Sequence, residues 1–146
     1  MKILVDADSC PVRDIIVKIA KKYNIPVFMF GDTSHILNDG YSTIITVDKA
    51  KDSADFAIAN KTEKSDIVVT QDYGLAVILL AKQAYIMHQN GFLYTEENID
   101  RMLLERHISS EMRRIGKKGL HPKKRNAQNN HAFEKAFNNL CIKLIK

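Results

Sequence analysis

Two aspartates, Asp6 and Asp8, flank a single alanine directly after the apolar run Ile3–Val5. Two carboxylates this close together can hold a divalent cation, accept a phosphoryl group or close a turn. Further aspartates follow two later apolar runs, at Asp48, Asp52, Asp55 and Asp72. The chemistry open to these side chains therefore depends on whether the fold brings the three segments together.

Short apolar runs rich in β-branched residues predict strands, and apolar residues at three- and four-residue spacing between them predict helices. The predicted strands are 3–5, 27–30, 43–47, 67–70 and 84–87, with a further short one at 92–94. The predicted helices are 11–23, 53–61, 74–83, 95–115 and 132–145. Strands that are almost entirely apolar are typical of a sheet covered on both faces. We therefore expect an α/β fold of three layers with a mainly parallel sheet.

The ends of three segments carry their own signals. Pro11 fits the first position of a helix, and Ser9 is a better N-cap there than Cys10. Thr95 fits an N-cap, with two glutamates in the first helical turn after it. The segment 116–130 is rich in glycine, lysine and asparagine and is predicted to be mobile.

In a parallel sheet the carboxyl ends of all strands lie at one edge, which binds ligands where the strand order reverses. If the order is 3-2-1-4-5, the first and fourth strands are neighbours at that reversal. Asp6 and Asp72 would then face one crevice. Asp52 and Asp55 are three residues apart and share a helix face.

Such a cluster is costly without a counter-charge. Ionised carboxylates about 6 Å apart repel by about 2.8 kcal/mol per pair at an effective dielectric constant near 20. Four of them would accumulate about 17 kcal/mol, which exceeds the roughly 5–15 kcal/mol that stabilises a domain. They must protonate, move apart or bind cations, and Mg²⁺ or Mn²⁺ suits oxygen ligands and can activate water against a phosphodiester. The candidate metal ligands are Asp6, Asp8, Asp52, Asp55 and Asp72, and all except Asp8 are also candidate catalytic residues.

The alternative is that each aspartate caps a helix or closes a turn. Asp48 could cap the helix after it, and Asp8 could organise the turn before Pro11. We favour function for Asp6 and Asp72, because both follow predicted strands at the ligand-binding edge. Asp8 stays open between the two roles.

The charge is distributed unevenly along the 146 residues. Residues 1–100 carry 10 Lys and Arg against 14 Asp and Glu, a net charge of −4, whereas residues 101–146 carry 12 against 3, a net charge of +9. Basic segments of this kind contact phosphate backbones, and RNA is the preferred partner, although a solvated helix face is the alternative. The candidate nucleic-acid-binding residues are Arg113, Arg114, Lys117, Lys118, Lys123, Lys124 and Arg125.

The length suits one domain, 1–146, with an α/β core over 1–94 and a helical, basic part over 95–146. No apolar run approaches the roughly 20 residues that cross a bilayer, and no signal peptide is visible, so a cytoplasmic protein without a membrane partner is expected. Cys10 and Cys141 are far apart and predict no disulfide framework. Cys10 is expected to be a small buried side chain. A homo-oligomer is compatible with the sequence.

Three segments, VDADSCPV, VDKAKDSADFAI and VVTQDYGLA, resemble the YaiI/YqxD family of bacterial proteins in order and spacing. That family is similar to PIN and NYN domains. The resemblance implies a nuclease-like fold with a 3-2-1-4-5 sheet and an acidic site for Mg²⁺ or Mn²⁺. By that resemblance Asp6, Asp52 or Asp55, and Asp72 match the acidic positions, and Asp8 matches the first motif.

Two rival functions remain. In a haloacid-dehalogenase-type phosphatase, Asp6 would be the nucleophile, Asp8 the general acid and Thr70 part of the second motif. Against it, the acidic pair of DSAD precedes VVTQD, which is the wrong order. In a non-catalytic RNA-binding module, Tyr73 or Tyr94 could stack on a base. The histidines show no metal-ligand spacing and stay unassigned: His35, His88, His107, His121 and His131.

Overall fold

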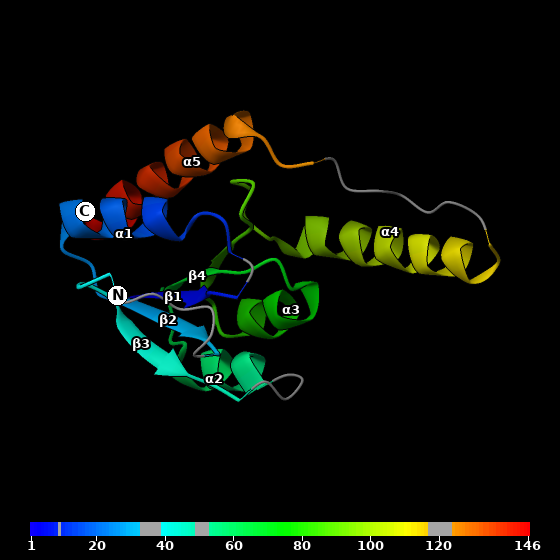
Figure 1. Ribbon diagram of the computed structural model, residues 1–146, viewed down its shortest axis with the longest axis horizontal. Helices are drawn as coiled ribbons and strands as arrows, with labels where there is room; N and C mark the ends of the chain where they lie inside the picture. The colour runs from blue at the N-terminus through cyan, green and yellow to red at the C-terminus, as the bar shows by residue number, and fades with distance from the viewer. Residues whose placement is uncertain (9, 33–38, 49–52, 117–123) are drawn as a thin grey trace.

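The computed structural model of the protein describes residues 1–8, 10–32, 39–48, 53–116 and 124–146 (Figure 1). Strands and helices alternate along the first two thirds of the described chain, except that β3 follows β2 directly in the order of elements, and two long helices follow. The strands are β1 (Ile3–Asp6), β2 (Val27–Gly31), β3 (Thr43–Thr46), β4 (Ile67–Val69) and β5 (Tyr85–Met87). The helices are α1 (Arg13–Tyr23), α2 (Ser53–Lys61), α3 (Tyr73–Ala81), α4 (Glu96–Arg114) and α5 (Ala127–Ile145).

The five strands form one parallel sheet in the order β3-β2-β1-β4-β5. This confirms the predicted order and places β1 at the centre, with Ile3 beside Val27 on β2 and Ile67 on β4. All three residues are buried, as expected for a sheet covered on both faces. In place of the predicted short strand at 92–94, a single antiparallel bridge joins Met87 to Leu93.

The sheet separates two apolar cores, which gives the predicted three layers. On one face α1 and α5 cover the strands, and Phe133 and Phe137 of α5 stack with ring centroids 5.2 Å apart. On the other face lie α2, α3 and the first turns of α4 (Figure 1). The C-terminal helix α5 is therefore part of the core and not an appendage. No described helix has the length and apolar character needed to cross a membrane.

Two helix starts differ from the prediction by two residues or more. Helix α1 begins at Arg13, so Pro11 lies in the turn before it; Val12 is the N-cap without a side-chain cap bond, and Ser9 is outside the described residues. Helix α5 begins at Ala127, five residues before the predicted start. There Asn126 and Asn129 form a reciprocal capping box, which converts a polar stretch that resembles a loop into a helix start. The predicted N-cap at Thr95 is confirmed.

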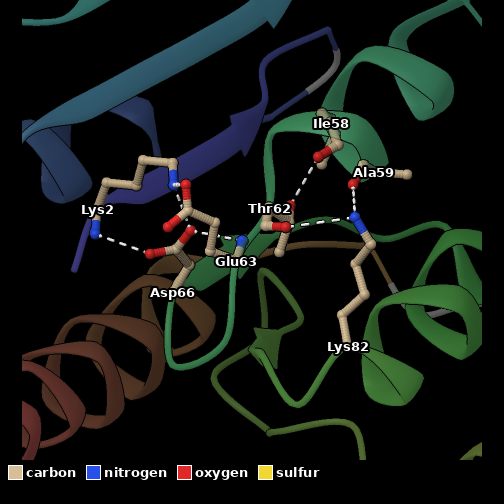
Figure 2. Close-up of polar contacts among 7 residues, drawn as sticks. All are labelled: Lys2, Ile58, Ala59, Thr62, Glu63, Asp66 and Lys82. Carbon is tan, nitrogen blue, oxygen red and sulfur yellow. Dashed lines mark hydrogen bonds and ion pairs between the residues drawn. The ribbon is translucent and has the colours of Figure 1, made fainter.

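A buried ion pair between Lys2 and Asp66 lies at the amino ends of β1 and β4 (Figure 2). The carboxylate of Asp66, in the turn before β4, accepts from Lys2 Nζ at 2.7 Å and from the backbone N–H groups of Lys2 at 3.1 Å and Glu63 at 2.8 Å. Nearby, Lys82 donates to the carbonyls of Ala59 and Thr62 at the end of α2. The pair joins the start of β1 to the turn before β4, so it helps to fix how these two strands are aligned. The candidate site lies at the opposite, carboxyl ends of the same strands.

We predict that Asp66→Ala lowers the free energy of unfolding by about 3 kcal/mol, because it leaves a charge and two backbone donors without their acceptor. The matched control is Glu134→Ala, which breaks an ion pair of the same 2.7 Å length between Lys18 and Glu134. The side chains are 17% and 4% exposed in the Lys2–Asp66 pair and 73% and 35% exposed in the control pair. The control should cost under about 1 kcal/mol in urea unfolding. Equal losses from the two variants would contradict the structural role of Asp66.

Candidate functional site

The candidate site forms where β1 ends beside β4. Asp6 is the last residue of β1, and its Oδ2 accepts a hydrogen bond of 3.0 Å from the hydroxyl of Thr70, which directly follows β4. Thr70 is 3% exposed. The reversal of strand order in this sheet lies at these two strands, where open α/β sheets bind ligands. Parallel pairing thus delivers Asp6 to the expected edge.

The same hydroxyl organises Asp72. The backbone N–H of Asp72 donates to Thr70 Oγ1 at 3.1 Å, and Asp72 Oδ1 in turn accepts from the backbone N–H of Leu75 at 3.1 Å. Asp72 is therefore the N-cap of α3, which is the structural role that the sequence left as the alternative. Capping orients its carboxylate and does not remove its charge from the site.

The charges are electrostatically coupled. The pKa of Asp6 is raised, chiefly because burial disfavours the ionised carboxylate. The hydrogen bond from Thr70 opposes this shift, while the negative charges of Asp72 and Asp8 add to it. A cation bound beside Asp6 would therefore be attracted by these negative charges and would stabilise the ionised carboxylate of Asp6.

Asp8 carries an unsatisfied oxygen. Its Oδ2 accepts from the backbone N–H of Asp32 at 3.3 Å. Its Oδ1 is buried, and no hydrogen-bond partner for it exists among the described residues. A buried acceptor without a partner costs about 1–3 kcal/mol. That cost is recovered when a water molecule or a cation occupies the adjacent space.

Such a space exists beside it. A cavity of about 10 Å³, the volume of a single water molecule or ion, lies between the ends of β1 and β4. Both Asp6 and Asp8 line it, so two carboxylates share one small space. The described lining residues are Asp6, Asp8, Cys10, Val69, Thr70, Gln71 and Gln89.

Arg125 supports one wall of this cavity. Its guanidinium donates to the carbonyl of Gln89 at 2.7 Å, to Asn90 Oδ1 at 2.7 Å and to Asn130 Oδ1 at 3.0 Å. These bonds hold the loop after β5 against the start of α5. Sequence reasoning treated Arg125 as a contact for nucleic acid and missed Gln89, because partners 35 and 36 residues away leave no local pattern.

Cys10 is buried, as expected. Burial raises the pKa of its thiol to about 11, although the positive charges of Arg13 and Arg125 act in the opposite direction. A thiol in this state is a poor nucleophile. The acidic neighbour that contributes is Asp6, and its effect is smaller than that of burial.

His88 follows β5 at the same edge of the sheet. Its ring stacks on Phe92 with centroids 4.5 Å apart, and its Nδ1 accepts from the backbone N–H of Asn90 at 3.0 Å. Burial lowers the pKa of His88 to about 4, and the positive charge of Arg125 adds to the shift. The ring is therefore neutral and has a structural role next to Gln89, which lines the cavity.

The other predicted residues lie elsewhere. Asp48 is exposed after β3, Asp55 is partly exposed in the first turn of α2 and does not line the cavity, and Asp52 lies outside the described residues. Of the basic set, Arg113 and Arg114 are exposed at the end of α4 and Lys124 is exposed before α5. Lys117, Lys118 and Lys123 lie outside the described residues.

The described residues contain no group of three or more His, Cys, Asp or Glu side chains that could hold a metal ion between them. What the structure does bring together is the pair Asp6 and Asp8, which line one cavity, and Asp72 is close enough to act on Asp6 electrostatically. A cation here would have two protein carboxylates and would complete its shell with water, which is the usual arrangement for Mg²⁺. The donor set fits such an ion.

Comparison with known proteins identifies relatives over almost the whole chain. The family model described as "Uncharacterized BCR, YaiI/YqxD family" matches residues 4–143. A UPF0178 protein of Ruminiclostridium cellulolyticum is 58% identical over 137 residues, which cover 94% of this chain and 90% of that protein. A UPF0178 protein of Natranaerobius thermophilus is 47% identical over 146 residues, covering 99% and 96%. No solved structure matches the chain.

We predict that His88 makes stability depend on pH. Folding lowers the pKa of His88 from 6.5 to about 4, so the unfolded chain binds the proton more tightly. The stability gained from the neutral ring is complete above the unfolded pKa and is lost as the pH falls towards the folded pKa. Between pH 7 and pH 5, the wild type should lose about 2 kcal/mol more than His88→Gln in urea unfolding. The control His107→Gln, at an exposed position on α4, should follow the wild type; identical pH dependence for wild type and His88→Gln would contradict the account.

Proposed function

This chain belongs to the uncharacterised YaiI/YqxD family, and we propose that it is a hydrolase that cleaves phosphodiester bonds, in RNA rather than DNA, with the help of Mg²⁺ or Mn²⁺. The site is the cavity between Asp6 and Asp8 at the end of β1. The proposal rests on the chemistry of that site, because the description of the family names no activity.

One observation carries the proposal. Asp8 Oδ1 is buried without a hydrogen-bond partner, and it belongs to a residue that lines a cavity of about 10 Å³ together with Asp6. The space has room for a single water molecule or ion, and two carboxylates surround it, one of which has an oxygen without a hydrogen-bond partner. Ionised carboxylates only accept hydrogen bonds, so this is an acceptor-only site. A neutral ligand could satisfy one oxygen. Burial is the main cause of the raised pKa of Asp6, and a divalent cation would also offset the repulsion from Asp72 and Asp8 that adds to it.

The residues of the chain have separate roles in this proposal. Asp6 and Asp8 hold the ion, Thr70 fixes the orientation of Asp6, and Asp72 adds negative charge from the N-terminus of α3. A bound divalent cation supplies a water of lowered pKa and withdraws charge from a phosphate oxygen. Asp52 and Asp55 were also predicted as ligands and catalytic residues; within the described residues Asp55 does not line the cavity, so its part would be in substrate binding or in a second ion site.

The preference for nucleic acid is supported by charge. Residues 101–146 carry a net charge of +9, and Arg125, from this part of the chain, acts electrostatically on Cys10 at the cavity wall. A guanidinium has five N–H donors, and three distinct acceptors are bound to that of Arg125. The arginine can therefore hold the loop after β5 and still attract a phosphate towards the cation.

A second candidate function has one observation in its favour. The hydroxyl of Thr70 donates to Asp6 at 3.0 Å, so in a phosphatase that uses Asp6 as nucleophile it would lie beside the phosphoryl group on Asp6. Attack by Asp6 would form an aspartyl-phosphate and release the alcohol, with Asp8 as the acid. Asp8→Asn then abolishes turnover of p-nitrophenyl phosphate, and an acid-stable phosphoryl group on Asp6 is detectable by mass spectrometry. Neither result is expected from a phosphodiesterase.

We predict that Mn²⁺ stabilises the wild type and fails to stabilise Asp6→Asn. At ten times the dissociation constant, Mn²⁺ should add about 1.4 kcal/mol to the free energy of unfolding. Without metal, Asp6→Asn should be at least as stable as the wild type, because the substitution removes a buried charge next to two others. Asp14→Asn, an exposed carboxylate on the first turn of α1, is the matched control and should respond to Mn²⁺ as the wild type does. An equal response of all three proteins would place the ion elsewhere.

We predict that the wild type cleaves single-stranded RNA in the presence of Mn²⁺ and that Asp6→Asn lowers the rate by at least about 100-fold, since the loss of a ligand to the reacting centre typically costs more than 2.7 kcal/mol. EDTA should abolish cleavage by the wild type and by Asp14→Asn. Binding of RNA without cleavage, unaffected by EDTA, would contradict the hydrolase and favour the non-catalytic RNA-binding module.

A further inference from the structure

Helix α4 has two apolar faces, and the body of the protein covers only one. Ile99 is buried and Met102 is partly buried, and both pack into the apolar core on the face of the sheet that α2 and α3 cover. On the outer face, Leu104, Ile108 and Ile115 are 57%, 43% and 62% exposed. Leu104 and Ile108 are four residues apart, so they lie in one stripe along the helix, roughly half a turn from Ile99 and Met102. Ile115 is the C-cap residue directly after the helix, at the end of this stripe.

An exposed stripe of this kind is unusual on a helix that already has a buried face. Surface helices of globular proteins keep their outer face polar, and contiguous exposed apolar side chains mark interaction sites. Helix α4 packs mainly against α3 and extends beyond the sheet, away from α1 and α5 (Figure 1). Its outer face is therefore accessible along most of its length to another protein.

The charges on α4 identify which protein would fit. The first two turns carry Glu96, Glu97 and Asp100, and the last turn carries Arg113 and Arg114. This polarity also suits the helix dipole, but the dipole gives no reason for the apolar stripe. A second α4 running in the opposite direction would bring the end that carries Arg114 alongside the end that carries Glu97 and Asp100. The helix is thus complementary to itself.

The spacing of the residues defines the register of such a pair. With the two-fold axis near Arg106, close to the middle of the helix, Leu104 of each copy meets Ile108 of the other. Arg101 of each copy then meets Glu111 of the other. Both contacts occur twice, as an isologous interface requires. Glu111 forms an exposed ion pair of 2.6 Å with Arg114 of its own helix, and an exposed pair of this kind is weak enough to exchange.

We infer that the outer face of α4, centred on Leu104 and Ile108, binds the same face of a second copy of this chain in antiparallel orientation. The apolar stripe supplies the buried centre of this interface, and the opposite charges at the two ends set its direction. The inference is independent of the proposed reaction, because none of these residues lines the cavity between Asp6 and Asp8.

Sedimentation equilibrium of the full chain over a concentration series tests the interface. The wild type is expected to be a dimer, and the double variant Leu104→Glu/Ile108→Glu should raise the dissociation constant at least about 100-fold, because it places four charges in the apolar centre. Phe56→Glu is the matched control: Phe56 is 70% exposed on α2, remote from the stripe, and its substitution should leave the dimer intact. Circular dichroism of each variant confirms that α4 remains helical.

Charge reversal tests the antiparallel register. Arg101→Glu sets a glutamate against Glu111 of the opposite copy, twice in each dimer, and should weaken the dimer about tenfold. Adding Glu111→Arg should restore it. Positions 101 and 111 lie about 15 Å apart along one helix, so this rescue cannot arise within a single copy.

Three outcomes would overturn the inference. The first is a wild type that stays monomeric at its highest attainable concentration. The second is a dimer that Leu104→Glu/Ile108→Glu leaves unchanged. The third is a double charge reversal that weakens the dimer further than Arg101→Glu alone, which would exclude the antiparallel register.

Discussion

Parallel pairing of β1 with β4 places Asp6 beside Thr70, and the hydroxyl of Thr70 then donates to Asp6 while accepting from the backbone of Asp72. The backbone of Thr70 is itself fixed, because its N–H donates to Met87 and its carbonyl accepts from the hydroxyl of Tyr94. Two of the acidic groups are thus positioned by buried secondary structure. A site built in this way keeps its geometry when the surface loops move.

The cost of collecting carboxylates is reduced by hydrogen-bond donors of the backbone and of Thr70, but unevenly. Asp72 is compensated by the N-terminus of α3 and Asp6 by a hydroxyl, whereas Asp8 keeps one buried oxygen without a partner. The estimate of about 17 kcal/mol for four close carboxylates is too high for the described residues, because Asp55 is outside the cavity and Asp72 is capped. The remaining electrostatic cost lies at Asp6 and Asp8, which line the cavity. This cost is the physical basis of the proposed cation site.

Sequence patterns predicted the elements whose signals are local. The bounds of α2, Ser53–Lys61, agree with the structure, since helical spacing is a local signal. The strand order also agrees, but it came from the family resemblance and not from a local pattern. Polar contacts between distant segments were not predictable. The sequence placed Asp6 at the correct edge but gave no sign that Gln89 joins it, because Arg125 holds that loop across 36 residues. The start of α5 was missed for a different reason. Asparagine-rich segments are typical of loops, and the sequence does not show that the side chains of Asn126 and Asn129 each accept a hydrogen bond from the backbone N–H of the other.

The central claim is that Asp6 and Asp8 share one divalent cation. The most direct measurement is anomalous diffraction from crystals of the protein soaked in Mn²⁺. We expect a single strong peak in the cavity between the two residues, within about 2.5 Å of an oxygen of each carboxylate, with Asp8 Oδ1 among the ligands. A peak that no oxygen of Asp6 or Asp8 approaches, or a cavity that holds only water at saturating Mn²⁺, would contradict it.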